Sequence, residues 1–128
     1  MRALRAVLIP LAVALAAGCD SGPRAGDVTM HLVSPVENLG AFSFAITAAE
    51  PTAIDTVTAA CPGCTAFMTR VSEREVRGVV TGDFGPGAVL HVTVTDTKVP
   101  QAYVGEVLDA SAPDYELVSI TGMQLTIP

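Results

Sequence analysis

The alternation of apolar and polar residues in short runs, from residue 28 onward, constrains the fold of this chain most strongly. In the clearest run, Leu90, Val92 and Val94 fall on one side and polar residues on the other. Successive side chains of a strand point to opposite faces, so such a run predicts a strand with one buried face. Strands are predicted in this way, or from Val- and Thr-rich runs, over residues 28–33, 41–47, 54–60, 66–71, 75–81, 90–95, 103–108 and 117–127, the last broken near Gly122.

Turn residues separate these runs, at intervals of roughly eight to twelve residues, which is typical of sandwiches and barrels. They are Ser34-Pro35, Glu50-Pro51, Pro62-Gly63, Gly82-Asp83, Gly85-Pro86-Gly87, Val99-Pro100 and Ala112-Pro113. With 128 residues, half of them hydrophobic, the chain has material for one core. We therefore predict a single all-β domain over residues 28–128, an antiparallel β-sandwich of about 7–9 strands, immunoglobulin-like or jelly-roll in type, with most aromatic side chains in its core.

The first 18 residues have a different character. Residues 1–5 carry two arginines and no acid, and residues 6–17 form an uncharged, mostly apolar run. A helix that spans a bilayer needs roughly 20 apolar residues, whereas this run is short and ends in small residues. We predict a cleaved signal peptide over residues 1–18.

The end of that run, Leu15-Ala16-Ala17-Gly18-Cys19, resembles the lipobox of bacterial lipoproteins, with Ala16 where leucine is usual. The resemblance implies that Cys19 becomes the acylated first residue and that its lipid chains, such as palmitate, hold the protein on a bilayer. Residues 19–27, rich in glycine and polar residues, then read as a flexible tether. The expected location is the cell envelope, on the extracytoplasmic side of a membrane. An ordinary secretory signal with an incidental cysteine is the alternative.

The charge of the chain argues against nucleic acid as a partner. Without Arg2 and Arg5, the 7 basic residues fall to 5 against 13 acidic residues, a net charge of −8. A surface that binds a phosphate backbone needs clustered cations, and no basic stripe is present.

Cys61-Pro62-Gly63-Cys64 is the most distinctive internal motif. With Cys19 acylated, these two thiols remain in an oxidising compartment, which favours a local disulfide in a turn between two strands. A thioredoxin-like redox site uses the same spacing but needs a helix after the first cysteine, where a strand is predicted here. A zinc site would need two further ligands, for which His31 and His91 are the available histidines.

Other sequence patterns that would indicate catalysis or ligand binding are weak. There is no Gly-x-Ser-x-Gly elbow. Asp109, Asp114 and Glu116 could approach a calcium ion but lack the acid-dense spacing of a calcium loop, so a solvated acidic rim is the simpler interpretation. The glycine-rich segment 82–87 has no following Lys-Ser/Thr, and we interpret it as a strand connection. No cofactor, metal or enzyme activity is predicted.

From Gly40 to Ile127 the order of features resembles the cohesin and carbohydrate-binding-module type of sandwich and small bacterial lipoproteins of the same layout. The resemblance is carried by residues 40–46, 79–92 and 123–127. It implies a non-catalytic binding or structural module of the envelope, anchored to the bilayer through Cys19, with a protein or a glycan as partner. The alternative is an envelope thiol-disulfide redox protein that uses Cys61 and Cys64.

Overall fold

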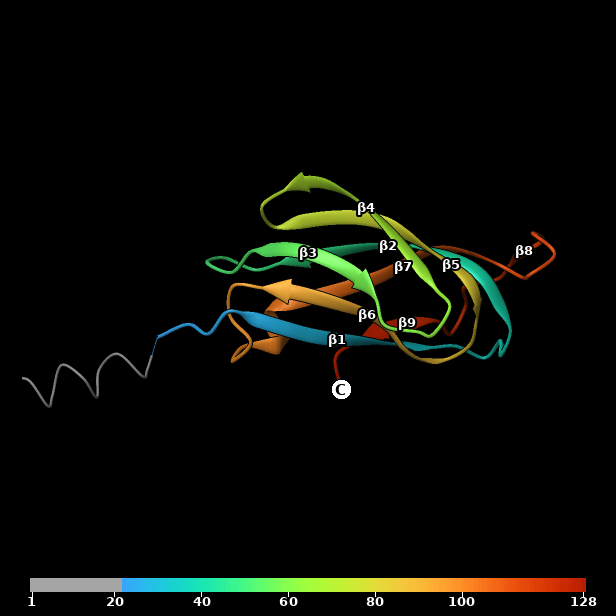
Figure 1. The fold of residues 1–128 in the computed structure, drawn as a ribbon, viewed down its shortest axis with the longest axis horizontal. Helices are drawn as coiled ribbons and strands as arrows, with labels where there is room; N and C mark the ends of the chain where they lie inside the picture. Colours follow the sequence, from blue (N-terminus) through green and yellow to red (C-terminus); the bar gives the residue numbers. More distant parts are fainter. Residues whose placement is uncertain (1–21) are drawn as a thin grey trace, which may run out of the picture.

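A computed structural model describes residues 22–128 of the chain (Figure 1). The predictions for residues 1–18 and for Cys19 lie outside the described residues. Within them, the chain forms nine strands and one 3-10 helix, η1, at Pro100–Ala102. The strands are β1 (Gly26–Val33), β2 (Leu39–Ala48), β3 (Ile54–Ala59), β4 (Thr65–Ser72), β5 (Glu75–Phe84), β6 (Gly87–Val94), β7 (Tyr103–Ser111), β8 (Leu117–Val118) and β9 (Gln124–Thr126).

The strands belong to one antiparallel sheet with the order β3-β6-β1-β9-β7-β2-β5-β4, and β8 pairs with β7 beside this path. The sheet curls so that its end strands, β3 and β4, come back near each other, which makes it nearly barrel-shaped (Figure 1). The all-β, antiparallel prediction is confirmed, whereas the division into two packed sheets stays a prediction. We call β3, β6 and β1 the β1 half, and β7, β2, β5, β4 and β8 the β2 half.

The core lies between the two halves and is filled by their inward-facing side chains. In β6 the three apolar residues of the alternation are buried and the intervening His91 is exposed, so the prediction is confirmed there. In the β2 half, the ring of Phe42 lies 6.0 Å from that of Phe44 and 5.7 Å from that of Phe84, between ring centroids. Aromatic pairs at such distances add to the stabilisation from burial.

Gly78, in the middle of β5, allows β4 and the core to approach closely. A Cβ atom at this position would fall on the carbonyl oxygen of Phe67 and lie 2.7 Å from Cζ of Phe44. On either side of it along β5, Val76 and Val80 are fully buried. The glycine therefore occupies an inward position where any side chain would collide with backbone.

The turn predicted at Gly82–Asp83 is wrong, because β5 continues through both residues to Phe84. The reason is a bulge: Ala41 pairs with Thr81 and Leu39 with Phe84, so β5 carries one extra residue opposite β2. A bulge leaves the extra residue unpaired but lets pairing continue on both sides of it, so a glycine that looks like a turn residue in the sequence can lie within a strand.

The end of the predicted tether, residues 19–27, is ordered where the structure describes it. The strand β1 begins two residues before the predicted start of the domain. Thr97 donates its backbone N–H to the carbonyl oxygen of Arg24 at 2.7 Å, and Nζ of Lys98 donates to the carbonyl oxygen of Gly22 at 2.8 Å. The turn after β6 therefore holds the segment that leads into β1.

Candidate functional site

Cys61 and Cys64 lie in the turn between β3 and β4, with their sulfur atoms 2.09 Å apart, as the disulfide prediction requires. The backbone N–H of Cys64 donates to the carbonyl oxygen of Cys61 at 3.2 Å. The next residue, Thr65, begins a strand, so no helix macrodipole is directed at either sulfur. The arrangement closes the turn that links the two end strands of the sheet.

The two histidines do not converge on this cysteine pair. Nδ1 of His91 is 3.2 Å from the hydroxyl oxygen of Thr29 on β1, and His31 pairs in register with Ala88. In residues 22–128 no group of three or more His, Cys, Asp or Glu side chains is placed to hold a metal ion. His91 instead takes part in a cross-strand contact on the outer surface of the β1 half.

Arg70 on β4 bridges the seam between the two end strands. Its Nη1 donates to the carbonyl oxygens of Ile54, at 2.8 Å, and of Ser72, at 3.2 Å, and its Nη2 donates to the carbonyl oxygen of Asp55. The guanidinium group thus supplies donors to carbonyls of β3 that no strand covers at this edge. We assign Arg70 a structural role as the side chain that nearly closes the sheet.

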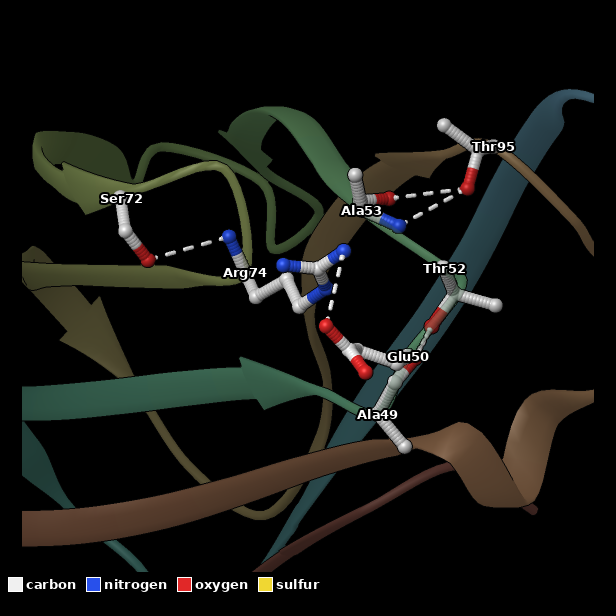
Figure 2. Close-up of polar contacts among 7 residues, drawn as sticks. All are labelled: Ala49, Glu50, Thr52, Ala53, Ser72, Arg74 and Thr95. Atoms are coloured by element: carbon white, nitrogen blue, oxygen red, sulfur yellow. Dashed lines mark hydrogen bonds and ion pairs between the residues drawn. The ribbon is translucent and has the colours of Figure 1, made fainter.

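A second group of contacts fixes the turns at the same end of the seam, as Figure 2 shows. Nη2 of Arg74 lies 3.6 Å from Oε1 of Glu50, and the backbone N–H of Ala53 donates to Oγ1 of Thr95 at 2.9 Å. Among the described side chains, Nε of Arg74 is the one buried nitrogen without a hydrogen-bond partner. These contacts join the β2–β3 connection to the turns that follow β4 and β6.

The seam also borders an open cavity of about 510 Å³, to which Arg70, Asp55 and Glu73 contribute charged side chains. Its volume is that of a small-molecule pocket. However, the one cation in its lining is committed to backbone carbonyls of β3, and the two acids carry the opposite charge to it. We therefore interpret the cavity as part of the seam.

The outer surface of the β2 half contains a shallow apolar depression of about 160 Å³, which we call the trough. Its floor is formed by small side chains of β2 and β7, and Val79 of β5 and Leu117 of β8 line it. In register, Ser43 pairs with Val79 and with Asp109, and Ser111 pairs with Leu117. The lining residues are Ala41, Phe42, Ser43, Val79, Asp109, Ala110, Ser111 and Leu117.

Large apolar side chains stand exposed on both sides of the trough. Phe67 of β4, directly opposite Val79, is 61% exposed, Tyr115 is 91% exposed and Leu117 is 81% exposed. From β4 to β8 the sheet has four strand spacings of about 4.8 Å, so these side chains span about 19 Å. An exposed apolar surface of this extent marks a site of interaction more often than a solvated surface.

Tyr115 stands in a turn with an unusual backbone. Its φ is 69°, and it is the one non-glycine residue with positive φ in the described chain. The turn is closed by hydrogen bonds from the N–H of Ala112 to the oxygen of Glu116, at 2.8 Å, and from the N–H of Tyr115 to the oxygen of Ala112, at 3.0 Å. Left-handed backbone is costly for a bulky residue, and such strain concentrates at functional sites.

The three acids predicted to form a solvated rim lie beside the trough. Asp109 lines it, and Asp114 and Glu116 flank Tyr115 in the turn. Oδ1 of Asp114 accepts the N–H of Glu116 at 3.1 Å. In the described part of the chain, the ion pairs join Arg74 to Glu50 and Arg77 to Glu75, so none of these three carboxylates has a cationic partner.

Sequence reasoning did not identify Phe67 and Tyr115 as surface residues, although four of the six aromatic residues are buried as expected. The β4 run has apolar residues in both phases of the alternation, so the pattern does not say which side faces the core. Tyr115 lies in a turn, where hydrophobic periodicity carries no information. A tyrosine between two acids, two residues after the Pro113 of a predicted turn, is the one sequence signal that indicates an exposed position.

The chain matches no protein-family model, and the comparisons with curated proteins and with solved structures found no match. Over residues 22–128, none of the helices is long and apolar enough to cross a bilayer.

Proposed function

We propose that this protein is an extracytoplasmic lipoprotein, anchored through acylated Cys19, which binds a second envelope protein at the trough without catalysing a reaction. The anchor is supported by the sequence around Cys19. The binding role is supported by one observation above all, the exposed apolar side chains that flank the trough on the β2 half.

The size of the trough favours a protein partner over a small ligand. Pockets for drug-sized ligands measure roughly 300–1,000 Å³, whereas the trough measures about 160 Å³. A shallow depression with aliphatic walls suits one or two apolar side chains of a protein partner, which can act as anchors of an interface. A glycan would use an aromatic platform with several polar groups, but Phe67 and Tyr115 lie on opposite sides of the trough.

As scaffold we propose the β-sandwich predicted from the sequence, of immunoglobulin-like or jelly-roll type. Its support is the weak junction at β9, which pairs with β7 only between Leu125 and Gly105. Opening this single pair would leave a sheet of four strands, β3-β6-β1-β9, and one of five strands, β7-β2-β5-β4 with β8 beside β7, that share one core.

The anchor is tested by mass spectrometry and membrane fractionation of the chain expressed with its signal in a bacterial host. The wild-type protein should start at Cys19, carry acyl chains and sediment with membranes. The Cys19→Ala variant should be soluble or unprocessed. Acyl-free wild-type protein would refute the anchor.

The binding role is tested by photo-crosslinking in intact envelopes. A photoreactive amino acid at Ser43, on the floor of the trough, should give a discrete, protease-sensitive adduct that is lost with Leu117→Ser. The same amino acid at Thr58, on the outer surface of the β1 half, is the control and should give none. Equal labelling from both sites, or an adduct unaffected by Leu117→Ser, would contradict a docking site at the trough.

A further inference from the structure

Resting on the proposed binding role, we infer that the occupant of the trough is a cationic polypeptide segment, with apolar side chains for the trough and Lys or Arg side chains for the acids beside it.

Charge complementarity is the first argument. Asp109 lies in the lining of the trough, and the exposed carboxylates of Asp114 and Glu116 lie in the turn that leads to Leu117. These three acids have no ion-pair partner in residues 22–128. Opposite charges across an interface steer association and fix register, so an apolar site with uncompensated acids selects a partner that is both apolar and basic.

The turn that carries Tyr115 is the second argument. Its closing hydrogen bonds hold a bulky residue at a φ of 69°, and the ring is nevertheless 91% exposed. Burial of the ring within the domain therefore does not compensate for the cost of this backbone conformation. Aromatic side chains bind cations over their faces, and a ring beside Asp114 and Glu116 is suited to a Lys or Arg side chain.

The position of the trough argues against the anchoring bilayer as occupant. Figure 1 shows the blue segment that leads into β1 at one end of the longest axis of the domain and β8 at the other end. If the chain is held at Cys19, only a few residues before Gly22, the Tyr115 turn faces away from that membrane. A second copy of the chain is also disfavoured, because a two-fold contact would bring both sets of these three acids into one interface of a protein whose net charge, without Arg2 and Arg5, is −8.

The test is a binding titration of the mature protein in detergent, with fluorescent nine-residue peptides as probes. The first peptide alternates Leu with Lys, the second alternates Leu with Glu, and the third is oligolysine. We expect the Leu/Lys peptide to bind, oligolysine to bind at least about tenfold more weakly and the Leu/Glu peptide not to bind. Leu117→Ser should weaken binding of the Leu/Lys peptide about tenfold, because burial of one leucine side chain contributes binding free energy of roughly that size.

Asp109→Asn should weaken binding of the Leu/Lys peptide about two- to threefold. In 1 M salt, where charges are screened, the variant and the wild type should bind the peptide equally. The matched controls are Val33→Ser and Glu37→Gln, an exposed apolar and an exposed acidic residue outside the trough, and both should bind as wild type. Circular dichroism of every variant excludes misfolding as the cause.

Binding of the Leu/Glu peptide, or Leu/Lys binding that Leu117→Ser and Asp109→Asn leave unchanged, would overturn the inference. If the Ser43 crosslink forms but excess Leu/Lys peptide does not compete with it, the partner is not cationic and the binding role stands. If no crosslink depends on Leu117, the binding role itself fails. Binding of a neutral glycan that the same variants abolish would show that the occupant of the trough is a sugar and not a peptide.

Discussion

The outer surfaces of the two halves of the sheet differ although their inner surfaces are alike. On the β1 half, Thr29, His91 and Thr58 form one row across three strands, and Oγ1 of Thr93 donates to Oδ1 of Asp27 at 2.6 Å. The corresponding surface of the β2 half has small residues between large exposed apolar side chains. Inward side chains thus specify the fold in both halves, whereas the outward ones form a polar surface on the β1 half and, on the β2 half, the apolar surface that we propose for docking.

The largest expected effect tests whether the β2 half packs more tightly than the β1 half. Gly78→Ala should lower the free energy of unfolding by about 3 kcal/mol, because its Cβ would collide with backbone of β4 and with Phe44. Gly26→Ala, at the start of β1, faces only Cγ2 of Thr97 at 3.1 Å and should cost less than about 1 kcal/mol. Urea denaturation measures both free energies of unfolding, and equal losses would contradict tighter packing of the β2 half.

The turn between β3 and β4, which links the end strands of the two halves, gives the next largest effect. Replacing Cys61 and Cys64 together by serine should lower the free energy of unfolding by less than about 2 kcal/mol, because the disulfide closes a very short loop. Thermal denaturation with and without a reductant measures this, since the reductant should shift the wild type to the melting temperature of the double variant. A much larger loss would show that the turn holds the halves together.

Arg70 bridges the same halves by hydrogen bonds. Arg70→Met keeps the aliphatic stem but removes the donors to the Ile54 and Asp55 carbonyls, and should cost about 1 kcal/mol. Hydrogen exchange should then accelerate at the amide of Ile54, which donates to the Glu73 oxygen across the seam. Arg77→Met, which breaks only an exposed ion pair, is the control and should leave exchange at the seam unchanged.

The smallest effect has the opposite sign. Tyr115→Gly should raise the free energy of unfolding by about 0.5–1 kcal/mol, because glycine adopts a φ of 69° without strain. The same variant should bind the Leu/Lys peptide more weakly than the wild type does. Val104→Gly, on β7 and also exposed, should instead lose stability, since glycine weakens a strand. A destabilised Tyr115→Gly protein would show that the tyrosine serves the fold.

The strand positions follow from the sequence to within a few residues wherever one phase of the alternation is apolar, as in β6. Prediction from the sequence failed where the local pattern of residues and the pairing of distant strands favour different structures. Gly82–Asp83 looks like a turn but lies in a bulge of β5, because pairing with β2 continues past it. The break predicted near Gly122 does separate β8 from β9, but the sequence does not reveal that β8 pairs with β7 and β9 with β1. Both outcomes depend on partners that are distant in the chain.

By itself, the sequence determined the all-β class and the proximity of Cys61 to Cys64, because each depends on residues close together in the chain. Only the tertiary structure decided that Arg70 would span the seam and that Phe67, Tyr115 and Leu117 would flank one trough. The alternation says that a side chain lies on one of two faces. Which face is covered, and which residues meet on the open one, depends on strand order and register, and these are set by the packing of the whole core.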